Sequence, residues 1–222
     1  MPVHAPSVAS QILQILGVGL VLTAFWMLAA RRLADYLNAY AAQSIAVALV
    51  AAVVGAFTGR LELYAVAVLT ILVKVVAITG ILRSVARRLP IQREVRPSLN
   101  LPTSLLIGVG LVLLAFLTSP SVVAPGTFLN EPPLAVSLTL VLMGLFLISS
   151  RRHVLAQVVG LLTIENGLFS GAIAIAYGMP FIVEFGILFD VLVAVIVLGL
   201  LVTMIQHHIV TADTAELRRL RG

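Results

Sequence analysis

Long apolar runs separated by short polar segments dominate this sequence. A helix needs about 20 apolar residues, at about 1.5 Å each, to cross a hydrocarbon core of about 30 Å. Pro102 and Pro132–Pro133 stand where the start of a helix tolerates proline, and Pro120 indicates the end of one. Seven runs are long enough to be transmembrane helices, with expected ranges of 9–30, 38–58, 61–82, 102–119, 133–150, 153–177 and 181–206. We therefore predict an all-α, polytopic integral membrane protein with about seven transmembrane helices.

The composition is typical of a membrane protein and excludes several kinds of bound group. Of the 222 residues, 61% are apolar and 10% are charged, whereas soluble domains have about 45–50% apolar and about 25% charged residues. The absence of cysteine excludes disulfides, thiolate metal sites and iron–sulfur ligation by this chain. The four histidines include no pair at i, i+4, and no nucleophile–base pair or cofactor fingerprint is present. We expect a non-catalytic chain without a metal or cofactor.

The formal net charge of +5 does not indicate nucleic-acid binding, because the basic residues lie in short clusters between the apolar runs. Positive charges accumulate in the cytoplasmic loops of membrane proteins. Counting alternate loops, one side of the membrane receives only Arg60. The other side receives Arg31, Arg32, Arg83, Arg87, Arg88, Arg93, Arg96, Arg151, Arg152, Arg218, Arg219 and Arg221. This bias predicts an amino terminus outside and a carboxyl terminus in the cytoplasm.

Three ionisable side chains lie well inside the apolar runs, namely Lys74, Glu165 and Asp190, and Glu184 lies near the outer end of the last run. A charged residue at the bilayer centre costs about 2.5 kcal/mol or more, so such residues usually face protein and serve a function. Burial and neighbouring charges make their protonation states easy to change, which suits proton transfer. The structural alternative is that Lys74 pairs with Glu165 or Asp190 in a buried salt bridge that fixes helix register.

The run 153–177 has two distinct faces on a helical wheel. Gly160, Gly167 and Gly171 share one face with Asn166, and such small residues favour close packing between membrane helices. Glu165 points the opposite way, among apolar side chains. Either Glu165 is neutral or protein from this chain or another covers that face, so we expect packing on both sides and a partner subunit. In the second run, Asn38, Gln43 and Ser44 are expected to form interhelical hydrogen bonds.

A weak internal repeat divides the chain. When the sequence is aligned with itself at a shift of 120 residues, Arg31–Arg32 aligns with Arg151–Arg152. A gap of four residues then aligns Lys74 with Asp190. Parallel repeats of this kind occur in transporters. The single membrane domain, residues 1–222, is thus expected to hold an amino-terminal three-helix part (1–100), a connecting helix (101–132) and a carboxyl-terminal three-helix part with a tail (133–222).

The carboxyl-terminal third carries the most specific pattern. The chain resembles component E, a membrane subunit of hydrogenase-4-type complexes, in Glu165, Asn166, Gly167, Val183, Glu184, Gly186, Ile187, Asp190 and Ala194–Val197. The last three helices are also similar to the K subunit of respiratory complex I, which carries a membrane glutamate in each of two successive helices. Glu165 matches the first of these glutamates, and Asp190 stands where the second is expected.

The resemblance implies a subunit of a group 4 [NiFe]-hydrogenase or related complex in a prokaryotic cytoplasmic (inner) membrane. The expected neighbours are antiporter-like and other membrane subunits and, indirectly, peripheral subunits that hold the nickel and iron–sulfur clusters. In this interpretation the chain contributes to proton translocation through Glu165, Asp190, Lys74 and Glu184. The alternatives are a purely structural subunit that links the antiporter-like subunits to the redox arm, and a free-standing small transporter.

Overall fold

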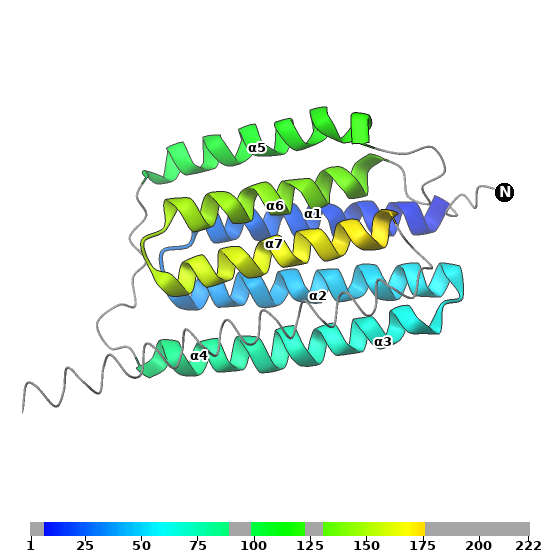
Figure 1. The fold of residues 1–222 in the computed structure, drawn as a ribbon, viewed down its shortest axis with the longest axis horizontal. Helices are drawn as coiled ribbons and strands as arrows, with labels where there is room; N and C mark the ends of the chain where they lie inside the picture. The colour runs from blue at the N-terminus through cyan, green and yellow to red at the C-terminus, as the bar shows by residue number, and fades with distance from the viewer. Residues whose placement is uncertain (1–6, 89–98, 123–130, 176–222) are drawn as a thin grey trace, which may run out of the picture.

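The computed structural model describes residues 7–88, 99–122 and 131–175, which form a bundle of long helices (Figure 1). Three consecutive segments, α3, η1 and α4, follow one another without a break and make a single long helix with a π-helical middle. The elements are α1 (Ser7–Ala29), α2 (Leu33–Thr58), α3 (Leu61–Thr70), η1 (Ile71–Ile78), α4 (Thr79–Arg88), α5 (Leu101–Val122), α6 (Glu131–Ser150) and α7 (Val154–Ile175).

Six helices in the described part of the chain are long and apolar enough to cross a membrane. The predicted all-α membrane fold is therefore confirmed, while the seventh run, 181–206, lies outside the described residues. Several boundaries differ from expectation, and the third helix continues to Arg88 rather than ending at residue 82. The second helix starts at Leu33 rather than at residue 38, because Leu33, Tyr36 and Leu37 are buried in the bundle. The prediction that Pro120 ends its helix is wrong, since proline's own φ is helical and α5 completes a last turn to Val122.

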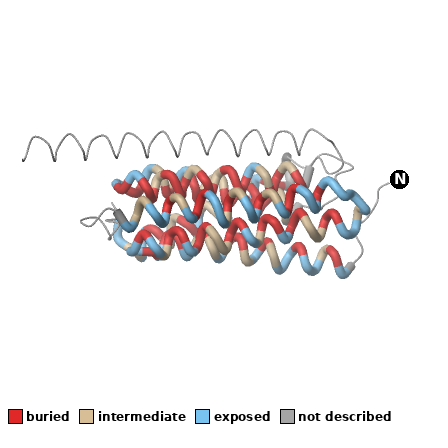
Figure 2. The backbone as a smooth tube through the Cα atoms, turned by 90° about the horizontal axis from the view of Figure 1, so that it is seen from below, coloured by how far each residue is buried: buried red, intermediate tan, exposed pale blue. Residues whose placement is uncertain are grey.

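The helix α7 is the most buried of the six membrane helices in the described part of the chain, and α5 is the least buried. The hairpin partners α6 and α7 pack along each other, while α1 contacts α6 and α2 contacts α7. The long helix α3–η1–α4 packs on α2 (Figure 1). In the most apolar stretch of α7, 67% of the residues are buried, against 17% in α5. Figure 2 shows the buried positions on the inward sides of the helices, and the exposed apolar side chains suit contact with lipid.

Basic residues gather at one end of the bundle. The α1–α2 connection, the end of α4 and the α6–α7 connection lie at the same end (Figure 1), and they carry Arg31, Arg32, Arg83, Arg87, Arg151 and Arg152. Arg60 lies at the opposite end, in the turn between α2 and α3. We call these the arginine-rich end and the Arg60 end. Which end faces the cytoplasm stays a prediction from the charge bias.

Glycines bring α6 and α7 into close contact. A Cβ atom on Gly144 of α6 would lie 2.6 Å from Ile164 Cγ1 and 2.7 Å from the Gly160 carbonyl oxygen. On α7, a Cβ atom at Gly167 would lie 2.9 Å from the Ser137 carbonyl oxygen. The Ser137 hydroxyl donates a 2.7 Å hydrogen bond to the Gly167 carbonyl. The face that holds Gly160 and Gly167 therefore lies directly on α6, and no larger residue fits there without moving backbone.

This packing predicts opposite effects for two glycine substitutions. Gly144→Ala places a methyl group against the backbone of α7 and should lower the free energy of unfolding by about 1–3 kcal/mol. Gly110→Ala is the matched control, because Gly110 lies in exposed α5 with nothing within 4 Å of an added Cβ. It should be neutral or stabilising by up to about 1 kcal/mol. Unfolding in detergent micelles measures both, and equal effects would contradict the proposed close contact.

Candidate functional site

Lys74 lies in the π-helical middle of the third membrane helix and is 1% exposed. The Lys74 carbonyl accepts the backbone N–H of Thr79 and, at 2.8 Å, the Thr79 hydroxyl. In this wider turn the Lys74 carbonyl thus accepts two hydrogen bonds from Thr79, one from its backbone and one from its side chain. Segments with π-helical geometry occur frequently at functional sites. No feature of the sequence pattern had predicted this one.

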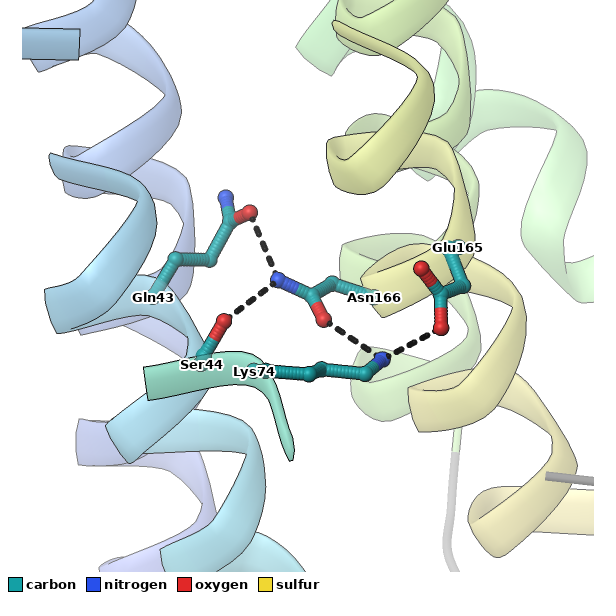
Figure 3. A network of polar contacts seen from close by, with 5 residues as sticks. All are labelled: Gln43, Ser44, Lys74, Glu165 and Asn166. Atoms are coloured by element: carbon teal, nitrogen blue, oxygen red, sulfur yellow. Dashed lines mark hydrogen bonds and ion pairs between the residues drawn. The ribbon is translucent and has the colours of Figure 1, made fainter. Parts of the chain in front are cut away.

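Lys74 and Glu165 form a buried ion pair between the third membrane helix and α7 (Figure 3). The Lys74 Nζ atom lies 2.8 Å from Glu165 Oε1, and the two side chains are 2% and 3% exposed. Lys74 stands near the middle of the span Leu61–Arg87, and Glu165 near the middle of Val154–Ile173. Of the alternatives left open by the sequence, the structure therefore contains the Lys74–Glu165 pair. Because the two formal charges cancel, the pair carries no net charge at membrane depth.

Asn166 extends the pair into a network that joins three helices. Its Oδ1 atom accepts a 3.1 Å hydrogen bond from Lys74 Nζ. Its Nδ2 atom donates to Gln43 Oε1 at 3.1 Å and to Ser44 Oγ at 3.3 Å, both on α2 (Figure 3). Gln43, Ser44 and Asn166 are fully buried. The Lys74 ammonium also lies 5.5 Å from the centre of the Phe169 ring, which is within the range of a cation–π contact.

The structure places the residues singled out from the sequence in two groups. Gly160, Gly167 and Gly171 face α6, but Asn166, which the helical wheel assigned to the same face, bonds to α2 and Lys74 instead. The helix α7 is packed on both sides, and the third membrane helix of this same chain covers Glu165. Glu165 is thus covered within this chain, whereas Leu168 on the same face is 50% exposed. Asp190 and Glu184 lie outside the described residues.

The interhelical hydrogen bonds expected of α2 are confirmed. Gln43 and Ser44 bond to Asn166 on α7, and Asn38 Oδ1 accepts a 2.7 Å hydrogen bond from Arg83 Nη2 on α4. These two connections differ in environment, because Asn38 and Arg83 are exposed at the arginine-rich end. The network around Lys74 lies deep in the bundle.

Arg151 has a role in packing that its loop position did not reveal. It is 2% exposed, and its Nη2 atom donates a 2.6 Å hydrogen bond to the Leu28 carbonyl at the end of α1. The last carbonyls of a helix lack partners within the helix and carry partial negative charge, so a guanidinium stabilises that end. The guanidinium lies 5.9 Å from the Tyr36 ring centre. Burial of the guanidinium lowers the pKa of Arg151.

Comparison with known proteins places the chain in a family. It is 35% identical over 206 residues to an uncharacterised protein of Mycobacterium tuberculosis, covering 91% of this chain and 93% of that protein. It is 31% identical over 185 residues to hydrogenase-4 component E of Escherichia coli, covering 82% of this chain and 85% of that protein. The chain belongs to the hydrogenase-4 component E family. The component E of Shigella flexneri matches to the same extent.

Membership in the component E family confirms the resemblance drawn from the carboxyl-terminal motifs and extends it over most of the chain. No family model matches the chain, and no solved structure matches it at a significant level. Together with the six apolar helices, the family relationship shows a multi-pass membrane protein. Within the described ranges, no three His, Asp or Glu side chains lie together as metal ligands would.

The network predicts that two asparagines differ in importance. Asn166→Ala removes hydrogen bonds to buried Lys74, Gln43 and Ser44, and should lower the free energy of unfolding by about 1–3 kcal/mol. Asn38→Ala removes one hydrogen bond at an exposed position and should cost about 0.5 kcal/mol or less. Thermal unfolding of both variants in detergent provides the measurement. A larger loss for Asn38→Ala would contradict the placement of Asn166 in the buried network.

Proposed function

We propose that this component E chain is a membrane subunit of a hydrogenase-4-like, complex I-related redox complex and takes part in its proton translocation. The observation that carries the proposal is the buried Lys74–Glu165 ion pair with its polar network in mid-span. Ionisable residues at membrane depth that face the bundle interior commonly lie on proton pathways. The pair consists of a proton donor and a proton acceptor in direct contact.

The geometry suits a short relay. Lys74 Nζ and Glu165 Oε1 are 2.8 Å apart, so a proton moves from the ammonium to the carboxylate along one hydrogen bond and leaves two neutral groups. Protonation of Glu165 from another donor removes the partner charge of Lys74 and favours release of the lysine proton. Asn166 Oδ1 holds Lys74 Nζ in place in either state, because the amide oxygen accepts from an amine and from an ammonium.

The proposed setting assigns the redox chemistry to other chains. Antiporter-like and other membrane subunits would lie beside this chain in the prokaryotic cytoplasmic membrane, with lipid over its remaining apolar surface. Peripheral redox subunits would act on it indirectly, and the chain itself would be non-catalytic. Asp190 and Glu184, in the last apolar run, remain proposed further stations for the proton.

A structural role is the second candidate, and the same network favours it. Lys74, Asn166 and Gln43 tie the third membrane helix, α7 and α2 together in one register. Buried polar contacts of this kind can specify how helices align. In that case the chain links antiporter-like subunits to the redox arm without moving protons itself.

Replacing Glu165 by glutamine in the assembled complex tests the proton relay. The glutamine amide keeps an oxygen acceptor for Lys74 but loses the carboxylate that binds a proton. We expect assembly to persist and redox-driven proton pumping in membrane vesicles to fall by about tenfold or more. Glu62→Gln is the control, because Glu62 is exposed in the first turn of α3. Proton pumping at the wild-type rate by an assembled Glu165→Gln complex would contradict the proposed relay.

A double substitution separates the relay from the structural role. Lys74→Met with Glu165→Met removes both charges together, and apolar replacement of a buried ion pair is often neutral for stability. Both candidates therefore predict an assembled complex. The relay predicts that proton pumping, measured as vesicle acidification, is lost to the same degree as in Glu165→Gln. Retention of full pumping would favour the structural role.

A further inference from the structure

The inner face of α2 carries a line of polar side chains in a helix that is otherwise largely apolar. Tyr36, Tyr40, Gln43 and Ser44 follow one another at helical spacing, so they share one side of α2. All four are fully buried. At 1.5 Å per residue, the line from Tyr36 to Ser44 covers about 12 Å along the helix axis. We call these four residues the polar line of α2.

The polar line has one end at the arginine-rich end of the bundle and the other at the ion pair. At the first end, the Arg151 guanidinium lies 5.9 Å from the centre of the Tyr36 ring. Gln43 and Ser44 accept hydrogen bonds from Asn166, which in turn accepts one from Lys74. Beyond Ser44, toward the Arg60 end, the buried residues of α2 are apolar or glycine, namely Val47, Ala48, Val50, Ala51, Val54 and Gly55. Along α2, the buried polar groups thus lie on one side of the ion pair only.

Several polar atoms along this route lack a hydrogen-bond partner among the described residues. They are Tyr36 Oη, Gln43 Nε2, Ser150 Oγ and Arg151 Nε, each fully buried. Three of them lie at the arginine-rich end, and Gln43 Nε2 lies at the network. Buried polar atoms in native proteins are nearly always bonded, either to protein or to water. In a membrane interior this requirement is stricter, because lipid supplies no partner.

We propose that the polar line of α2 forms a hydrated path from the arginine-rich end to the Lys74–Glu165 pair, closed toward the Arg60 end. The proposal rests on the proton relay and gives it a route to one side of the membrane. Each water on the path accepts one proton and passes another on, so one proton moves with no net change along the path. The last acceptor is the Glu165 carboxylate or a neutral Lys74 amine.

Because this chain has no native cysteine, label found on this chain after the subunits are separated reports the introduced cysteine alone, and the assembled complex can be tested directly. Ser44→Cys is almost isosteric and probes the end of the path, and Gln43→Cys is a second probe in case the first variant fails to assemble. Two controls are equally buried. Ala48→Cys lies one turn beyond Ser44, and Ala39→Cys lies nearer the arginine-rich end but off the polar line. The probe is a membrane-impermeant methanethiosulfonate, added to sealed vesicles of either orientation.

Thiols react as thiolates, which form where water reaches them. Cysteine at position 44, or at 43, should therefore react about tenfold or more faster than cysteine at 48 or 39. This labelling should occur only in vesicles whose arginine-rich end faces the reagent. Equal, slow labelling at all four positions would overturn the path, as would labelling of position 44 from the Arg60 end.

The two proposals fail in different ways. If Glu165→Gln stops pumping but cysteine at positions 43 and 44 stays unreactive, the relay holds and the path along α2 is wrong. If cysteine at position 44 is labelled from the arginine-rich end but Glu165→Gln pumps normally, the hydrated path holds and the relay is wrong.

Discussion

The ion pair between Lys74 and Glu165 constrains how the third membrane helix and α7 can lie against each other. Taking one charge into a membrane interior is costly, and removing one partner of a buried pair typically costs about 3–5 kcal/mol. Each residue therefore makes the other tolerable. Asn166 connects the pair to Gln43 and Ser44, so the third membrane helix, α7 and α2 must meet at one depth. The glycine contacts between α6 and α7 fix the other side of α7.

A buried ion pair is not needed for stability alone, because apolar side chains of similar size often serve equally well. Its presence in mid-span, with a π-helical segment around Lys74, supports a functional role. A proton can pass within the pair, from the lysine ammonium to the carboxylate, without placing net charge in the membrane interior, because both groups become neutral. This property suits a chain whose relatives include components of hydrogenase-4. In the proposed function, proton movement through this chain would be coupled to electron transfer in other subunits. The polar line of α2 would give the pair access to one side of the membrane.

Much of the fold follows from the hydrophobic pattern, because an apolar run of membrane length has to satisfy its backbone as a helix. The same pattern says little about which helices meet. Lys74 and Glu165 were recognisable as misplaced charges, and Gln43 and Ser44 as hydrogen-bonding residues, but their common site depends on helix packing. Apolar residues surround Glu165 on its own helix, and its partner comes from a distant part of the chain. Likewise, Arg151 is one loop arginine among several in sequence, and only its contact with Leu28 sets it apart.

The central claim is that Glu165 gains and loses a proton while paired with Lys74. Infrared difference spectroscopy of the assembled complex, poised before and after reduction by its electron donor, observes this directly through the carbonyl stretch of a protonated carboxyl group. We expect a carboxyl band that disappears in Glu165→Gln and shifts in Lys74→Met. A difference spectrum in which no carboxyl band depends on Glu165 would contradict the relay.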